Sequence, residues 1–271
     1  MIYQGEVMSE LHKTDSETDF IESLGASGRP VAIITGAACR VGRAISLKLA
    51  DADYDLLLTY FNSVSEIQLL EKELVGRDIN VVTQRVDFNN PSDAQKWARG
   101  VAQRLPRLDA LVHNAAIYYS TSLDDIDCET VEHFLRINAV SPLLISAVFS
   151  AILKKNRGAI VALTDIHADG FPRVNYIAYA MSKAALTGMV RGLARDLAPE
   201  VRVNAVAPGV IAWPENGPDS SEEIQEQYLR RVLLQRAGTP EEAADLVLFL
   251  LHGAKYITGQ IINLDGGRSL M

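Results

Sequence analysis

The 271-residue sequence lacks several features that define whole classes of protein. Its only cysteines, Cys39 and Cys128, lie far apart and outside any metal-ligand spacing, which excludes a disulfide framework and favours the reducing cytoplasm. No run approaches the roughly 18 apolar residues of a membrane span, and the N-terminus lacks the pattern of a secretion signal. The net charge of −8 disfavours nucleic acid or an anionic membrane as the main partner.

The first 29 residues differ in composition from the rest of the chain. They are polar and acidic and show no lasting periodicity, so we predict a flexible N-terminal tail over residues 1–29, with a partner-binding arm as the alternative. No internal repeat, low-complexity block or Pro/Gly-rich linker divides the chain after this segment. Residues 30–271 are therefore predicted to form a single domain.

Short apolar runs alternate with helical patterns from residue 31 onward. This alternation predicts an α/β fold with a doubly wound, Rossmann-like parallel sheet that helices cover on both faces. Sheets of this kind bind ligands at the carboxyl ends of their strands, where the strand order reverses. The predicted strands are Val31–Thr35, Asp55–Tyr60, Asn80–Gln84, Ala110–His113, Ala159–Thr164, Arg202–Ala205 and Gln260–Leu264. The predicted helices are Val41–Ala52, Val64–Val75, Ser92–Arg104, Cys128–Lys155, Tyr176–Leu197 and Glu241–Leu250.

The first predicted strand leads directly into the sequence TGAACRVGRAI. Gly36 and Gly42 bracket a turn that opens a helix, and residues without bulky side chains let the backbone approach a pyrophosphate at the helix N-terminus. Arg40 and Val41 lie inside this turn, and Arg40 replaces the middle glycine of the usual fingerprint. A guanidinium there is predicted to face a phosphate or an electron-rich substrate edge, although a solvated helix-start arginine is the simpler alternative.

The second predicted strand ends without a carboxylate. An acid at this position would bind the ribose of NADH and repel the 2′-phosphate of NADPH. Asn62 and Ser63 stand there instead and can donate hydrogen bonds, and Arg40 and Arg43 lie in the adjacent turn. We therefore predict NADPH as the cofactor.

Tyr179 and Lys183 stand four residues apart at the start of a helical pattern. That spacing puts both side chains on one helix face, where the ammonium is expected to lower the pKa of the phenol and make it a proton donor. Asp165 closes a buried strand upstream and is predicted to face the same point. His113 ends another strand, and we expect it to be a packed residue because the sequence offers it no acidic partner.

Together these segments resemble the short-chain dehydrogenase/reductase family over residues 31–270. The resemblance rests on TGAACRVG, Asp87, HNAA, RINAVSP, YAMSK, VNAVAPG and the closing DGG, in order and spacing. It implies a seven-stranded sheet, a nicotinamide cofactor, Tyr179 as the proton donor and Lys183 as the residue that lowers the tyrosine pKa and holds the nicotinamide ribose. It further implies that Asn138 anchors a water of the proton relay. The remaining implied cofactor residues are Asp87, Phe88, Asn114, Ala115, Ala116, Pro208, Gly209 and Val210.

The departures from that family pattern narrow the resemblance further. Asp165 stands where most members carry a serine that binds a substrate carbonyl, and an ionised carboxylate has no proton to donate to a ketone oxygen. Asp165, Arg40 and an aromatic residue after the HNAA segment, Tyr118, are together similar to pteridine and dihydromonapterin reductases. Two differences from that branch are Asn62, where its trypanosomatid members carry a basic residue, and one extra residue between Asp165 and Tyr179.

The predicted reaction is NADPH-dependent reduction of a pterin C=N bond, with a dihydropterin or dihydrofolate as substrate. Hydride comes from NADPH, and Asp165 supplies the proton to the ring nitrogen, directly or through a water and helped by Tyr179. The predicted substrate-binding residues are Arg40, Tyr118, Asp165, Tyr179 and Trp213, with Trp213 serving as a lid or as a loop anchor. Acids around Glu222 are interpreted as a solvated helix face. Two alternatives stay open: a reductase of 3-oxoacyl or other ketone substrates, and a non-enzymatic NADP-sensing protein. No metal is expected, and the apolar helix over Cys128–Lys155 predicts a homo-oligomer, a tetramer by resemblance.

Overall fold

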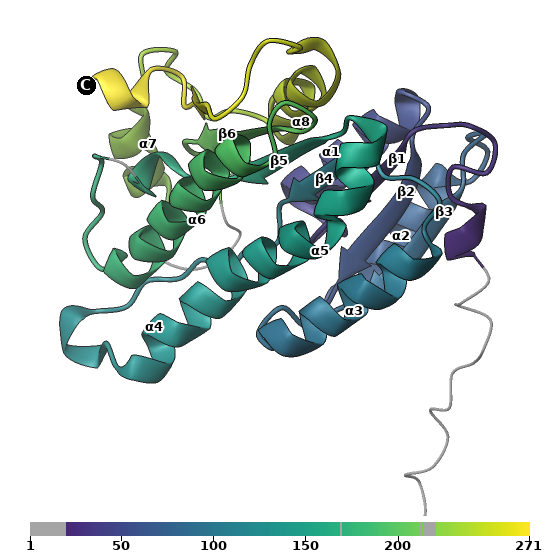
Figure 1. The fold of residues 1–271 in the computed structure, drawn as a ribbon. Coiled ribbons are helices and arrows are strands. Elements are labelled where there is room, and N and C mark those ends of the chain that lie inside the picture. Colours follow the sequence, from purple (N-terminus) through teal and green to yellow (C-terminus); the bar gives the residue numbers. More distant parts are fainter. Residues whose placement is uncertain (1–19, 169, 212, 214–220) are drawn as a thin grey trace, which may run out of the picture.

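The computed structural model describes residues 20–168, 170–211, 213 and 221–271, which form a three-layer α/β domain (Figure 1). Seven parallel strands make one sheet in the order β3-β2-β1-β4-β5-β6-β7. The strand order reverses between β1 and β4, so the predicted doubly wound sheet is confirmed. The strands are β1 Val31–Ile34, β2 Asp55–Tyr60, β3 Val81–Arg85, β4 Ala110–His113, β5 Ala159–Leu163, β6 Arg202–Pro208 and β7 Ile261–Leu264.

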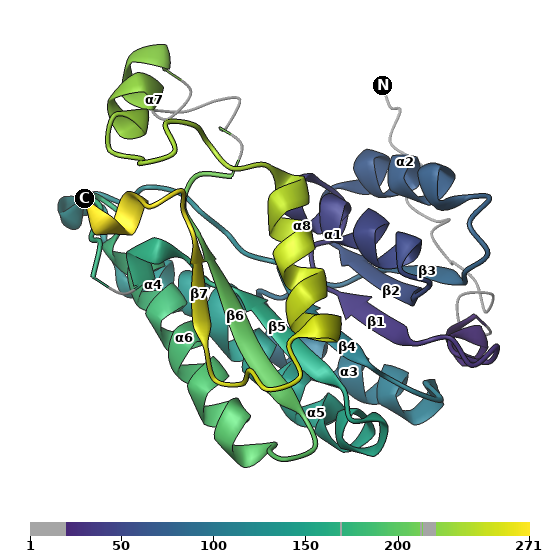
Figure 2. The ribbon, with the colours of Figure 1, turned by 90° about the horizontal axis from the view of Figure 1, so that it is seen from above.

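Helices cover both faces of the sheet because the central strands are apolar on both sides. Figure 2 shows one layer formed by α1, α2 and α8 and an opposite layer formed by α3, α5 and α6. Alternate residues of β1 enter the two cores, with Val31 and Ile33 on the α3–α5–α6 side and Ala32 and Ile34 on the other. The helices are α1 Arg40–Asp51, α2 Val64–Leu74, α3 Pro91–Arg104, α4 Cys128–Leu135, α5 Ser141–Asn156, α6 Ile177–Asp196, α7 Glu222–Leu229 and α8 Pro240–Leu248.

The helix predicted over Cys128–Lys155 is interrupted. Arg136–Val140 forms a π-helical turn between α4 and α5, and Asn138 lies buried at its centre. The combined stretch Cys128–Asn156 has the length and apolar composition of a membrane span, and 44% of its most apolar window is buried inside the protein. Phe149 and Leu153 on α5 are fully buried against the sheet, so this stretch is a covering layer of the domain.

The packed chain begins before the boundary predicted at residue 30. Residues 1–19 lie outside the described part of the chain, but Ile21–Ser23 forms a 3-10 turn, and Ile21 and Leu24 are buried in the core. The carboxylate of Asp55, itself fully buried, accepts a hydrogen bond from Gly25 N at 2.8 Å. The polar composition concealed this anchor, because its two apolar contacts are too few to produce periodicity.

Several functional candidates share the carboxyl edge of the sheet. The turn after β1, the loops after β2 and β3 and the segment after β4 open on this edge, as do Asp165 after β5 and Gly209 after β6. β6 continues to Pro208, three residues beyond the predicted end at Ala205, and pairs with β7 there. The fold therefore gathers residues that are far apart in the sequence at the site expected for a doubly wound sheet.

Candidate active site

A cleft of about 450 Å³ lies at the carboxyl ends of β1, β2, β3 and β4, where the strand order reverses; we call it the switch-point cleft. Asp87 is the one acidic residue among its described lining. Arg43 is not among its lining residues and pairs with Glu73 of α2. The predicted cofactor residues that line the cleft are Gly36, Arg40, Val41, Gly42, Asn62, Ser63, Asp87, Phe88, Asn114, Ala115 and Ala116.

The turn after β1 is packed too tightly for side chains. A Cβ at Gly42 would lie 2.1 Å from the Gly36 oxygen and 2.6 Å from Asn114 Nδ2. Gly36 adopts φ +62°, a conformation in which side chains are strained, and a Cβ there would lie 2.8 Å from Ala115 Cα. Asn114 joins the turn to the end of β4 by donating from Nδ2 to the Gly36 oxygen at 2.8 Å. These two glycines are therefore required by the shape of the cleft floor.

Gly42→Ala is expected to destabilise the protein by about 1–3 kcal/mol, because the Gly36 carbonyl cannot move without disturbing the turn. Gly100 in α3 is the matched control, since a Cβ there meets nothing within 4 Å. Gly100→Ala should instead be neutral or stabilise by up to about 1 kcal/mol through helix propensity. Urea unfolding of both variants measures the difference, and equal stability of the two would contradict the packing argument.

Arg40 is held in a strained backbone conformation, with φ +50°. A left-handed conformation costs an arginine about 1–2 kcal/mol, which the surrounding structure offsets. Arg40 lines the switch-point cleft and also a second cavity behind it. Arg40 therefore borders both spaces, and its contact with a phosphate or an electron-rich substrate edge stays a prediction.

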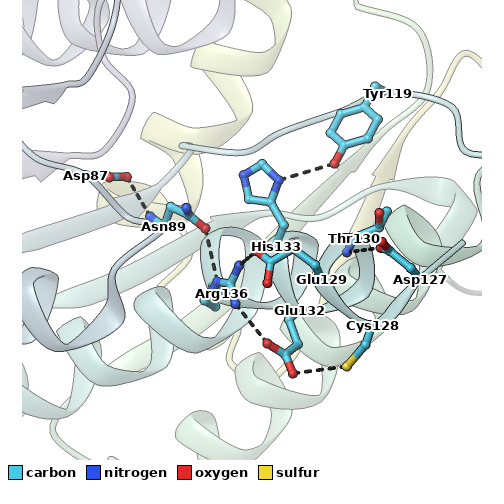
Figure 3. A network of polar contacts seen from close by, with 10 residues as sticks. All are labelled: Asp87, Asn89, Tyr119, Asp127, Cys128, Glu129, Thr130, Glu132, His133 and Arg136. Atoms are coloured by element: carbon cyan, nitrogen blue, oxygen red, sulfur yellow. Dashed lines mark hydrogen bonds and ion pairs between the residues drawn. The ribbon is translucent and has the colours of Figure 1, made fainter.

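Arg136 connects α4 to the loop that carries Asp87 (Figure 3). The Asp87 carboxylate accepts a hydrogen bond from Asn89 N at 2.8 Å, and Asn89 Oδ1 accepts one from Arg136 Nε at 3.1 Å. Arg136 also pairs with Glu129 and, at 3.0 Å, with Glu132. This network orients Asp87 in the switch-point cleft.

The second cavity, of about 230 Å³, lies against α6; we call it the Tyr179 cavity. Gly209 and Val210, which follow β6, also line it, whereas the predicted cofactor residues Pro208 and Lys183 line neither cavity. All five predicted substrate-binding residues line the Tyr179 cavity: Arg40, Tyr118, Asp165, Tyr179 and Trp213. Among the described residues, no group of three His, Cys, Asp or Glu side chains could hold a metal ion.

Asp165 and Tyr179 are in direct contact inside this cavity. The Tyr179 hydroxyl donates to Asp165 Oδ2 at 2.6 Å, and Asp165 Oδ1 accepts a second hydrogen bond from His167 N at 2.8 Å. Burial and the negative charge of Asp165 together raise the pKa of Tyr179 well above its ordinary value. The prediction that Lys183 lowers this pKa is therefore wrong for the protein alone, because the neighbouring carboxylate favours the neutral phenol.

Lys183 and Asn138 support the site from behind. Lys183 is buried, and its Nζ donates to the Leu163 oxygen at 2.7 Å and lies 5.9 Å from the centre of the Tyr179 ring. Burial lowers the pKa of Lys183 to about 8. Asn138 Nδ2 donates to Ser182 Oγ at 2.9 Å and to the Ile117 oxygen at 3.1 Å, so its amide fastens α6 to the segment after β4.

An aromatic group forms one wall of the Tyr179 cavity. Tyr118 stacks on Tyr176 with a centroid separation of 4.9 Å and meets Tyr179 edge-on at 4.8 Å. Arg173 lies 4.4 Å above the Tyr176 ring and donates to the Tyr118 hydroxyl. Tyr119, by contrast, packs on Phe134 and lies outside the lining of the cavity.

The sequence reasoning missed a second aromatic contact. Trp213 meets the Tyr228 ring edge-on at 5.4 Å, and the Arg268 guanidinium lies 5.4 Å from the centre of the same ring. Tyr228 is the lone aromatic residue of α7, whose acidic residues are exposed as predicted; Asp219 lies outside the described residues. That lone aromatic residue in a polar helix was the signal from which the contact could have been predicted.

His113 is buried beside Ser146 and lines neither cavity, and burial lowers its pKa to about 3.

Comparison with known proteins decides the family. A family model described as enoyl-(acyl carrier protein) reductase matches residues 36–269. The chain belongs to the short-chain dehydrogenase/reductase family. It is 33% identical over 243 residues to the uncharacterized oxidoreductase YmfI of Bacillus subtilis, covering 87% of this chain and 97% of that protein.

Two further relatives are named for different activities. Pteridine reductase 1 of Leishmania tarentolae is 32% identical over 283 residues, covering 89% of this chain and 96% of that protein. A 3-oxoacyl-[acyl-carrier-protein] reductase of Synechocystis is 31% identical over 242 residues, covering 88% and 96%. A solved short-chain dehydrogenase of Burkholderia cenocepacia in complex with NADP superposes with a TM-score of 0.81 at 29% identity, covering 89% of this chain and 98% of that chain.

Proposed function

We propose that this oxidoreductase reduces a C=N bond of a pterin ring with NADPH. The observation that carries the proposal is the hydrogen bond from Tyr179 to Asp165 inside a cavity walled by Tyr118. A carboxylate at this position suits a ring with N–H groups and basic nitrogens, because it accepts hydrogen bonds and returns protons. Pteridine reductase 1 of Leishmania tarentolae supports the proposal as a relative of nearly full length.

The switch-point cleft fits a dinucleotide. Its floor is the tightly packed turn of Gly36 and Gly42 at the N-terminus of α1, and such a glycine turn at a helix N-terminus is a typical pyrophosphate site. Asn62, Ser63 and Arg40 line its end without an acid after β2, and this favours a 2′-phosphate. The structural relative bound to NADP supports the same cofactor. When bound, a reduced nicotinamide supplies the hydride.

The residues of the Tyr179 cavity control the proton. Both carboxylate oxygens of Asp165 accept hydrogen bonds, so the mobile proton of the pair belongs to the Tyr179 hydroxyl. The carboxylate holds that proton on the phenol until a substrate nitrogen with a growing negative charge competes for it. Arg40 and the face of Tyr118 orient the flat ring of the substrate. Lys183 holds α6 against β5 through its hydrogen bond to the Leu163 oxygen.

A ketone reductase is the second candidate. The 31% identical 3-oxoacyl-[acyl-carrier-protein] reductase and the description of the family model favour it. Its weakness is Asp165, which offers a ketone oxygen no hydrogen-bond donor while it is ionised.

The test is NADPH oxidation followed at 340 nm with 7,8-dihydromonapterin, 7,8-dihydrofolate and an acetoacetyl thioester in parallel. Turnover of a dihydropterin supports the proposal. Turnover of the thioester alone refutes it in favour of the ketone reductase. NADPH binding without turnover of any of the three would favour the non-enzymatic alternative.

We also infer that the chain forms a homo-oligomer through α5 and α6. Leu143 on α5 and Ile177 and Met181 on α6 are exposed apolar side chains, and burial in a second copy would remove them from water. Light scattering of the purified protein measures the assembly, and a monomeric mass would refute this inference.

A further inference from the structure

A chamber of about 500 Å³ adjoins the Tyr179 cavity. His167, Arg173 and Tyr228 line both, so the two spaces lie side by side. The chamber leads away from the Asp165–Tyr179 pair toward α7 and the C-terminal segment. We call it the arginine chamber because Arg173, Arg231 and Arg268 line it together.

The charge of the arginine chamber is opposite to that of the whole protein. The chain carries a net charge of −8, yet no Asp or Glu is among the chamber's described lining residues. Asp165 lines only the adjoining Tyr179 cavity. Met271 borders an outer pocket together with Arg231 and Arg268. Three guanidinium groups held in one concave site create a local positive field.

Two of these arginines have hydrogen-bonding capacity left over. Arg268 Nε is buried and has no hydrogen-bond partner among the described residues, while its guanidinium rests against the Tyr228 ring. Among the described residues, the Arg231 side chain makes no hydrogen bond or ion pair. The unpaired Arg231 guanidinium can therefore pair with an arriving anion.

We propose that the arginine chamber binds the anionic tail of the substrate whose ring is reduced beside Tyr179. This inference rests on the proposed function for the ring and adds the tail. The tail carries carboxylates, as in a glutamate conjugate of the pterin, because a carboxylate matches the planar guanidinium in a paired geometry. A phosphate-bearing tail shares this anionic chemistry, and the experiment separates the two.

The test compares Arg231→Glu with Arg230→Glu. Arg230 neighbours Arg231 at the end of α7, lines none of the described cavities and pairs at 3.8 Å with Glu226. Both variants replace an arginine by a glutamate, so they change the net charge equally. Steady-state KM is measured for 7,8-dihydrofolate, for 7,8-dihydromonapterin, whose tail is uncharged, and for acetoacetyl-coenzyme A. In Arg231→Glu the KM for dihydrofolate is expected to rise at least about tenfold, and that for dihydromonapterin to change less than about twofold. Arg230→Glu should leave both unchanged.

Equal effects of Arg231→Glu on both pterins, or no effect on either, would overturn the inference. A rise confined to acetoacetyl-coenzyme A supports an anion site but assigns it to a phosphate tail. If neither pterin is reduced, the proposed function fails, and calorimetry with p-aminobenzoyl-glutamate then decides the chamber alone. Binding that Arg231→Glu weakens and Arg230→Glu preserves supports the anion site, and absence of binding to the unaltered protein refutes it.

Discussion

Replacing Asp165 by Ser is expected to lower dihydropterin turnover by about 10²–10³-fold while a 3-oxoacyl thioester is reduced at an unchanged or higher rate. The Asp165 carboxylate accepts a hydrogen bond from the Tyr179 hydroxyl at 2.6 Å, and serine removes that charge and leaves only a weaker, neutral acceptor for a ring N–H. A serine hydroxyl can, however, donate to a ketone oxygen. Steady-state kcat/KM for the two substrates measures the exchange of specificity.

Tyr179→Phe is the control for that result, because it removes the proton donor that both reactions share. It should cost about 10²–10⁴ in rate for either substrate. Asp165→Ser should also lower the pKa of Tyr179, since the raising effect of Asp165 disappears while burial persists. A spectrophotometric tyrosine titration, with Tyr179→Phe as the reference, detects this shift. Equal losses of both substrates in Asp165→Ser would contradict a role for the carboxylate in substrate choice.

The doubly wound parallel sheet was predictable from the sequence, because short apolar runs and helical patterns alternate clearly along the chain. β2 and β4 begin and end at the predicted residues. The π-turn around Asn138 was not predictable, since a five-residue turn leaves the apolar pattern of Cys128–Lys155 nearly unchanged. The anchoring of Ile21 and Leu24 depends on the buried carboxylate of Asp55, a contact between distant segments that no local pattern reveals.

In the candidate site, too, some features were predictable from the local sequence and others were not. Most motif residues line one of the two cavities because the segments that carry them lie at the carboxyl edge of one parallel sheet. The charge state of Tyr179 could not be inferred from the spacing to Lys183, since the closer Asp165 carboxylate and burial dominate its pKa. Arg173, Tyr228 and Arg268 come from three separate loops and helices, so their convergence depends on tertiary packing alone.

Lys183→Met is expected to make the protein more stable and far less active. Lys183 is buried, and burial lowers its pKa to about 8, with Asp165 opposing the shift. An unfolded lysine titrates near pH 10.4, so below pH 8 the folded state holds a proton that it binds less tightly than the unfolded state does. This costs roughly 3 kcal/mol of unfolding free energy, an order-of-magnitude figure, and the hydrogen bond to the Leu163 oxygen recovers about 1 kcal/mol.

Methionine removes the buried charge and keeps a side chain of similar length, so Tm at pH 7 should rise by about 2–8 °C. The sign of the pH dependence follows from the lowered pKa. Between pH 8 and about 10.4 the unfolded chain binds the proton and the folded protein does not, so the unaltered protein gains stability with rising pH and the advantage of Lys183→Met disappears. Lys154→Met on the exposed end of α5 is the matched control and should show no such convergence. Lower stability of Lys183→Met at pH 7 would mean that the interactions of the ammonium outweigh its burial cost. Retained NADPH oxidation by this variant would show that Lys183 has no role in the reaction. A lysine kept at such a cost in stability is best explained by a role in the reaction that Tyr179 and Asp165 perform.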